Sequence, residues 1–169
     1  MAPIASFFSL YAVEELHWDA VGFLWAIAAG SEIPLMLISA RLIRRYGAPR
    51  LLSVSVLAVA VRLAIYTFIP NIAGAVVGQA LHSLCFGLFH PAAISFVATH
   101  VPPEQRASGM AMYLSLGVGL PTFIGSTAGG FILEYSGYRF LFASFIVFAL
   151  ASFLVYLLAR KRLEAPSRL

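Results

Sequence analysis

The chain has 169 residues, of which 61% are hydrophobic and only 11% are charged. An average soluble domain is about 45–50% apolar and about 25% charged. A water-soluble globule of this composition would expose much of its apolar surface and aggregate. The composition therefore excludes a disordered chain, a collagen-like fibre and a disulfide scaffold, and it speaks against a soluble enzyme.

Long apolar runs follow one another along the whole chain. A helix needs about 20 mostly apolar residues to cross a bilayer. Complete spans are predicted over residues 21–41, 51–69, 72–98, 108–133 and 139–159. Residues 1–13 are apolar but too few to cross alone, and we interpret them as the outer part of a further helix. The sequence predicts an all-α, polytopic transmembrane helix bundle, with five full spans plus a truncated first one, as a single domain over residues 1–169.

The positive charge is divided unevenly between the two sides of this bundle. If consecutive helices alternate in direction, nine of the eleven Lys and Arg residues share one side, and Arg139 lies on the other. The nine are Arg41, Arg44, Arg45, Arg50, Arg106, Arg160, Lys161, Arg162 and Arg168. The positive-inside rule then puts the C-terminus in the cytoplasm, and we expect a bacterial plasma (inner) membrane as the location. These cations serve topology and lipid headgroups, so no nucleic acid partner is expected.

Aromatic residues are predicted near the outer ends of the helices. They are Tyr11, Trp18, Trp25, Tyr66, Tyr135 and Tyr138. Tyr and Trp concentrate where a membrane protein meets the headgroup layer, so an aromatic belt is expected there.

Glu32 and Arg62 are predicted inside the bilayer, near the middle of helices 21–41 and 51–69. An ionisable group at that depth costs on the order of 2.5–3.5 kcal/mol on insertion scales and therefore needs an explanation. One explanation is an interhelical ion pair that fixes the packing. The functional alternative is a proton-coupling or substrate cavity in which Glu32 gains and loses a proton as Arg62 moves.

Helix 72–98 carries Gln79, His82, Phe86 and His90 at steps of three, four and four residues. This spacing puts them on one broad face, which has to meet protein or water. A cavity role is expected for the polar residues of this face. The alternatives are a hydrogen bond from His82 to a neighbouring helix carbonyl, and a role for His90 in satisfying a helix kink at Pro91.

A stripe of small residues marks the helix predicted over 108–133. Its members Gly117, Pro121, Gly125 and Gly129 recur every four residues. Such a stripe lets another helix approach closely, either within the bundle or as an interface with a missing partner. Pro121, like Pro34, is also expected to break its helix internally.

Motifs of soluble catalysis are absent from the sequence, including HExxH, GxSxG, a Walker loop and Cys/His clusters with metal-ligand spacing. We therefore expect no enzyme activity, no cofactor and no metal site. Cys85 is interpreted as a packing residue, and as the only cysteine it permits no internal disulfide.

These features, in this order, resemble the C-terminal half of a major facilitator superfamily transporter, in the branch with lactose permease, phenylpropionate permease and nucleoside/proton symporters. The seventh and eighth helices of that family, with their acidic residue at Glu32, are similar to the segment FFSLYAVEELHWDAVGFLWAIAAGSEIPLM. RLIRRYGAPRLL resembles the basic loop that follows, and VRLAIYTF supplies the ninth-helix arginine at Arg62. QALHSLCFGLFHPAAISFVA resembles the tenth helix with its histidine at His82. PPEQRASGMAMYLSLGVGLPTFIGSTAGGFILEYSGYRFLF resembles the eleventh helix and the start of the twelfth.

The resemblance implies a symporter that moves protons and a small organic solute by alternating access between two six-helix halves. It puts Arg62 and His82 in the proton-coupling and substrate network. It also implies a cytoplasmic gating loop made of Arg44, Arg45, Gly47 and Arg50, although the acidic residue that usually precedes its arginine is absent. Lactose permease has a carboxylate one turn after the tenth-helix histidine, where this chain has Cys85. We hypothesise that Glu32 takes over the coupling role.

Met1 falls within the seventh helix of that pattern, so a fragment or a misplaced start is expected, without the N-terminal six-helix half of the same transporter. The fragment alone is expected to be inactive. Two alternatives remain open. The chain is then either a non-transporting membrane module for packing, assembly or sensing, or a half-size transporter that acts as a homodimer.

Overall fold

The computed structural model describes residues 2–163, which form helices joined by short turns, with no β-strand in that range. Met1 and Arg168, which the sequence arguments include, lie outside the described residues. Four helical stretches are long and apolar enough to cross a membrane, over residues 21–46, 48–68, 72–100 and 103–161. The all-helical class predicted from the composition is therefore confirmed.

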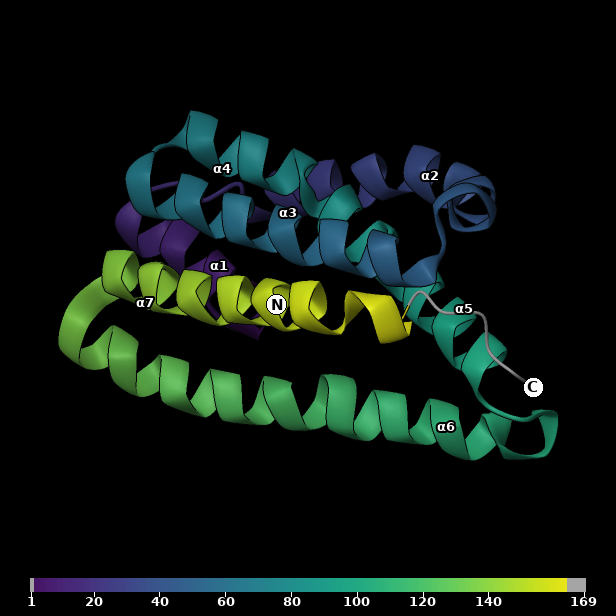
Figure 1. Cartoon of the computed structure of the whole chain (residues 1–169). Helices are drawn as coiled ribbons and strands as arrows, with labels where there is room; N and C mark the ends of the chain where they lie inside the picture. Colours follow the sequence, from purple (N-terminus) through teal and green to yellow (C-terminus); the bar gives the residue numbers. More distant parts are fainter. Residues whose placement is uncertain (1, 164–169) are drawn as a thin grey trace.

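The helices follow the chain as a bundle of antiparallel neighbours (Figure 1). In chain order they are α1 (Ala2–Leu10), η1 (Tyr11–Glu15), α2 (Val21–Tyr46), α3 (Ala48–Phe68), α4 (Ile72–Ala80), η2 (Ser83–Gly87), α5 (Phe89–His100), η3 (Pro103–Gln105), α6 (Arg106–Met112), η4 (Tyr113–Gly119) and α7 (Leu120–Leu163). The segments η1, η2 and η4 are π-helical, and η3 is a short 3₁₀ turn.

Helix α7 folds back on itself at Gly137, whose φ of 74° and ψ of 176° are not helical. A positive φ strains any residue with a Cβ atom, so glycine suits this turn. Figure 1 shows the two arms of α7 running in opposite directions. Helix α7 makes with α3 the most extensive helix–helix contact of the bundle.

Two expectations about helix breaks are corrected. Helix α2 continues through Pro34 without interruption. Pro121 is the second residue of α7, directly after the π-helical segment η4, so it lies where one type of helix gives way to another and not at a break.

The basic connection between α2 and α3 is also shorter than expected. Arg44 and Arg45 lie in the last turn of α2, and Arg50 lies in the first turn of α3. Only Gly47 connects the two helices, with a φ of 82°. Cations at the C-terminal end of a helix interact favourably with its dipole, which explains why α2 extends beyond the predicted apolar span.

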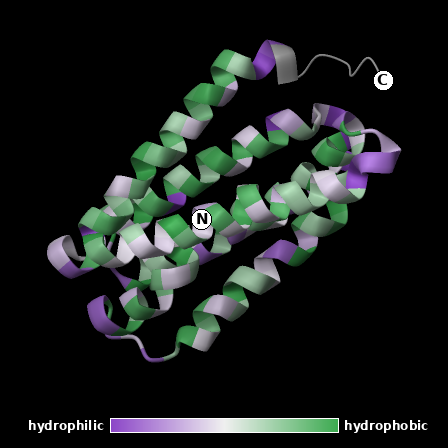
Figure 2. Cartoon of the chain, turned by 90° about the horizontal axis from the view of Figure 1, so that it is seen from below, coloured by the Kyte–Doolittle hydropathy of each residue, from purple (hydrophilic) through white to green (hydrophobic). Residues whose placement is uncertain are grey.

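Most of the basic residues lie near the ends of helices, at one end of the bundle. The α2–α3 connection, the α5–α6 connection and the end of α7 gather at one end of the bundle (Figure 1). Figure 2 shows hydrophilic residues mostly at the two ends and hydrophobic residues along the middle. The described cations of the basic group therefore share one end, as the alternating-helix argument predicts.

Half of the predicted aromatic belt lies in the core instead. Tyr11 and Tyr66 are each 1% exposed and Tyr138 is 8% exposed. The rings of Tyr66 and Phe142 lie 5.1–5.9 Å from the Tyr11 ring. Buried aromatic pairs at such distances stabilise the fold beyond the burial of their area. Tyr66 does lie in the last turn of α3, and Tyr138 directly follows the turn of α7, but both side chains are buried. Hydropathy places a tyrosine along a helix and does not distinguish the core from the headgroup layer.

The small-residue stripe is packed within the chain over part of its length. Gly125 and Gly129 are buried, whereas Gly117 and Pro121 are exposed. A Cβ atom added at Gly129 would lie 2.6 Å from Cε2 of Phe7 and 3.3 Å from Cδ1 of Leu141. The absence of a side chain at Gly129 thus lets α1 approach the first arm of α7.

Replacing Gly129 with valine is expected to destabilise the protein by about 1–3 kcal/mol, because the buried Phe7 ring leaves no room for the added carbons. Gly130→Val is the matched control, since a Cβ atom there would have no neighbour within 4 Å. The measurement is the thermal unfolding midpoint of each purified variant in detergent. Equal midpoints for the two variants would contradict the packing argument.

Candidate functional site

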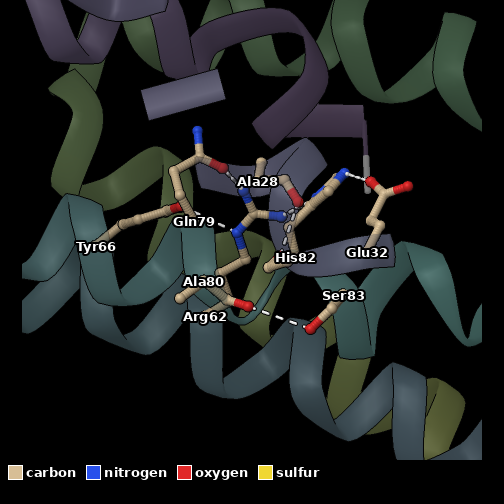
Figure 3. Close-up of polar contacts among 9 residues, drawn as sticks. Ala28, Glu32, Arg62, Tyr66, Gln79, Ala80, His82 and Ser83 are labelled. Carbon is tan, nitrogen blue, oxygen red and sulfur yellow. Dashed lines mark hydrogen bonds and ion pairs between the residues drawn. The ribbon is translucent and has the colours of Figure 1, made fainter. Parts of the chain in front are cut away.

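Arg62 is the centre of a polar cluster inside the bundle. It is 1% exposed, although it is among the largest side chains in the chain. Its Nε donates to the Tyr66 hydroxyl at 2.9 Å, and one terminal nitrogen donates to Nδ1 of His82 at 2.6 Å. The other terminal nitrogen donates to Oε1 of Gln79 (Figure 3). The planar guanidinium thus binds three different side chains from α3, α4 and the turn that follows α4, which an ammonium group could not do in the same geometry.

His82 lies between Arg62 and Glu32 and joins them (Figure 3). Its Nε2 lies 2.8 Å from Oε1 of Glu32. A guanidinium can only donate, so Nδ1 of His82 accepts from Arg62 and carries no hydrogen. The hydrogen is therefore on Nε2, which donates it to Glu32. The geometry specifies a neutral His82 of one tautomer between a cation and a carboxylate.

The two side chains at the Glu32 end of the cluster are accessible, unlike Arg62. The side chains of His82 and Glu32 are 15% and 17% exposed. The Trp25 ring meets His82 edge-on at 6.3 Å. The cluster therefore has a closed end at Arg62 and a partly open end at Glu32.

The interhelical ion pair considered for Glu32 and Arg62 is not a direct one, since the His82 ring separates the two groups. The His82 side chain binds other side chains and not the helix carbonyl that the alternative required. Glu32 and Arg62 were proposed from their depth in the membrane, and Gln79 and His82 from their spacing on one helix face. The four side chains do lie together (Figure 3).

Gln79 is fully buried, and its oxygen is taken by Arg62. Its Nε2 has no hydrogen-bond partner among the described residues. An unpaired buried donor costs about 1–3 kcal/mol, so the position retains its amide at a cost. Gln79 fixes the guanidinium and leaves two N–H donors in the interior.

His90 belongs to a second, smaller polar contact. Its Nδ1 lies 2.9 Å from the Tyr113 hydroxyl, which links α5 to the start of η4. The Phe86 ring stacks on His82 at 5.3 Å and meets His90 edge-on at 4.2 Å. His90 therefore connects to the Arg62 cluster through an aromatic ring, and it does not share its hydrogen bonds.

A cavity of about 860 Å³ opens beside this second contact. Its walls come from α3, the η2–α5 region and both arms of α7, and they are mainly apolar, with Phe86, Phe89, Phe145 and Phe148 among them. His90 is one of its few polar lining residues. A large apolar space with few polar groups is the usual form of a small-molecule site.

Tyr66 and Tyr113 are site residues that the sequence argument missed. Tyr66 follows Arg62 by four residues on one helix, and side chains at that spacing are neighbours. The spacing in the sequence could therefore have predicted this contact. Tyr113 bonds a residue 23 positions away on another helix, and no local pattern indicates such a contact. The cations Arg44, Arg45 and Arg50 lie at helix ends, far along α2 and α3 from this cluster.

Comparison with known proteins gives consistent results. The model of the MFS_1 like family matches residues 1–144. A maltose permease of Geobacillus stearothermophilus is 30% identical over 84% of this chain and 36% of its own length. A probable 3-phenylpropionic acid transporter of Escherichia coli (strain K12) is 27% identical over 76% of this chain and 35% of its own length. The chain thus spans about a third of the length of the curated relatives it matches.

A crystal structure of a mutant form of the nucleoside transporter NupG has the same fold. It superimposes with a TM-score of 0.77 at 18% sequence identity, over 89% of this chain and 42% of that chain. These relatives are transporters and not enzymes, and four helical stretches of this chain can cross a membrane. By its family match over residues 1–144, this integral membrane protein belongs to the MFS_1 like family of the major facilitator superfamily of transporters.

Proposed function

We propose that the chain is the C-terminal half of a proton-coupled secondary transporter that moves a small organic solute by alternating access. In this proposal the spans are a partial helix over 1–13 and full helices over 21–41, 51–69, 72–98, 108–133 and 139–159. An N-terminal six-helix half completes the cavity, as in other transporters built from repeated halves. The share of the relatives that the chain covers supports this assignment.

The Glu32–His82–Arg62 chain of contacts is the observation that carries the proposal. A proton added to His82 would go to Nδ1 and face the N–H of Arg62, so that contact would be lost. A proton added to Glu32 goes to a carboxylate that is partly exposed and whose other oxygen forms no hydrogen bond with a described residue. Glu32 is therefore the proton carrier. Because His82 binds both groups, the charge of Glu32 affects the contact between His82 and Arg62.

In this proposal alternating access depends on His82, because both Glu32 and Arg62 bind it. While Glu32 is charged, His82 is held between a carboxylate and a guanidinium. Neutral Glu32 attracts the His82 N–H less strongly, because hydrogen bonds to ionised acceptors are roughly twice as strong as neutral ones. The free energy of the closed arrangement thus depends on the proton, as a coupled transporter requires.

Gln79 and His90 are the polar groups proposed to meet the solute. His90 does so from the wall of the larger cavity, whereas the unpaired N–H groups of the buried Gln79 meet it only when the closed end of the cluster opens. The relatives are described as carriers of maltose, 3-phenylpropionic acid and nucleosides, which share little chemistry. The proposal therefore keeps to a small organic solute.

The basic end of the bundle faces the cytoplasm in this proposal, so that the C-terminus is cytoplasmic and the membrane is the bacterial inner membrane. The positive-inside rule supports this orientation. Arg44, Arg45, Gly47 and Arg50 then form the cytoplasmic gate, as paired helix ends and not as a flexible loop. Gly117, Pro121 and Gly125 line the larger cavity, and Gly129 packs against Phe7. In this proposal a helix of the missing half approaches the stripe on the side of that cavity.

The coupling is tested with de-energised cells that express the intact gene product, meaning the full-length transporter that this proposal assumes. The cells are kept in a weakly buffered medium. Maltose, 3-phenylpropionate and uridine are added one at a time while the external pH is recorded. We expect one solute to make the medium transiently alkaline, and a protonophore to abolish this signal.

Three other outcomes would overturn the proposal. Uptake without proton movement means facilitated diffusion. Folded protein that carries none of a broad solute panel means a packing or sensor module. Full transport by a homodimer of the 169-residue chain means a half-size transporter.

A further inference from the structure

A second cavity, of about 400 Å³, lies at the basic end of the bundle between the start of α3 and the end of α7. Arg50, Tyr156, Arg160 and Lys161 line it. Three of these four residues are cations, and no carboxylate lines the cavity within the described part of the chain. The cavity is a recess of positive charge, and its size falls within the range of small-molecule sites.

The start of α3 adds to the positive potential of this recess. Arg50 is the third residue of this 21-residue helix. The first N–H groups of a helix have no intrahelical acceptor, and the helix dipole is positive at this end. An anion between α3 and α7 would therefore meet three side-chain cations and the positive end of a helix.

Arg50 lies at one end of a row of exposed apolar side chains on α3. Val54, Leu57 and Val61 follow it at steps of four, three and four residues, so the four side chains share one face of the helix. These three apolar residues are 46%, 41% and 47% exposed. The face runs along α3 from the basic end and is not covered by any described residue of the chain.

Lys161 ends a matching surface on the second arm of α7. Leu157, Leu154 and Leu150 precede it at the same steps, and they are 40%, 55% and 48% exposed. The two helices pack against each other in opposite directions. Two exposed apolar stripes thus end in two cations that line one cavity.

We propose that this cavity binds the phosphate headgroup of an anionic phospholipid, whose acyl chains lie along the two apolar stripes. Tyr156 lies at the headgroup level, where tyrosine is favoured. A free phosphate ion would use the cations but not the stripes, so the stripes favour a lipid. The inference rests on membrane insertion alone, and it holds whether or not the Glu32 network couples protons.

The test is binding of phosphatidylglycerol to the intact gene product in a neutral detergent, followed by native mass spectrometry. Phosphatidylcholine, whose zwitterionic headgroup has the phosphate but no net charge, is the comparison. Each cation near an anionic lipid is worth about 1 kcal/mol, so Arg160→Gln with Lys161→Gln is expected to weaken phosphatidylglycerol binding about 25-fold. The charge-preserving pair Arg160→Lys with Lys161→Arg is expected to retain it.

The matched control is Arg41→Gln with Arg106→Gln, which removes two exposed cations from the same end but outside the cavity. We expect less than a twofold change. An equal loss in the control overturns the site in favour of diffuse surface charge, and tight binding of inorganic phosphate alone overturns the lipid assignment. If the variant with both glutamines does not fold, the comparison of the two lipids on the unaltered protein still tests the proposal. Equal binding of phosphatidylglycerol and phosphatidylcholine overturns it.

Discussion

Replacing Arg62 with alanine is expected to abolish proton-driven uptake, with a loss of roughly 100-fold or more. The substitution removes three hydrogen bonds at once and leaves Oε1 of Gln79 and Nδ1 of His82 without their donor. It also leaves the Glu32 carboxylate without the cation that lies beyond His82. Breaking a buried charge cluster in this way costs about 3–5 kcal/mol, so the unfolding midpoint in detergent is expected to fall as well.

Arg62→Lys separates charge from geometry. A lysine keeps the positive charge but cannot reach three acceptors with a rigid fork. We expect it to recover part of the stability and little of the uptake. Arg106→Ala, which removes an exposed cation at the basic end, is the control and is expected to transport normally. Normal uptake by Arg62→Ala would show that the cluster serves packing only.

Glu32→Gln is expected to separate solute movement from proton movement. The amide oxygen of glutamine can still accept from Nε2 of His82, so the contact and the fold are kept. The side chain can no longer gain or lose a proton. We expect accumulation against a gradient to fall about tenfold or more, while exchange of solute between the two sides at equal concentration continues.

The measurement compares uphill accumulation with equilibrium exchange in vesicles of the intact gene product. Glu104→Gln is the control, since Glu104 is exposed in the turn before α6 and contacts none of the cluster. Loss of both activities would assign Glu32 to structure or solute binding. Unchanged accumulation would assign the proton to another group.

The sequence was sufficient to predict the all-helical class, because apolar runs long enough to cross a membrane leave a simple pattern. The structure has four membrane-capable stretches in its described residues, and the spans predicted over 108–133 and 139–159 fall in one of them, over 103–161, which turns at Gly137. The ends of the helices were less predictable. Helix α2 continues to Tyr46 because arginines at its C-terminal turn stabilise it, whereas a hydropathy argument stops at the first charged residues. The three π-helical segments were not predicted, since their extra residue leaves no mark on composition.

Four side chains of the polar cluster could be singled out from the sequence, but not its tyrosine Tyr66 and not the connections among them. Glu32, Arg62, Gln79 and His82 were identifiable because polar groups inside a membrane are costly. Which of them bind each other depends on how α2, α3 and α4 are rotated about their axes. That rotation comes from packing across the bundle, and so the bridging position of His82 could not be read from spacing.

The π-helical segment η2 has a consequence for how the two polar contacts communicate. On an ordinary α-helix, side chains four residues apart drift sideways around the axis, so a column of rings would soon separate. In a π-helix the hydrogen bonds reach one residue further, and side chains four apart lie closer to one line. His82, Phe86 and His90 form such a column across η2. The Phe86 ring is stacked on His82 and meets His90 edge-on, so the three rings form a continuous contact between the two polar sites. A π-helical segment in this place therefore allows the Arg62 cluster and the wall of the larger cavity to share one row of packed rings.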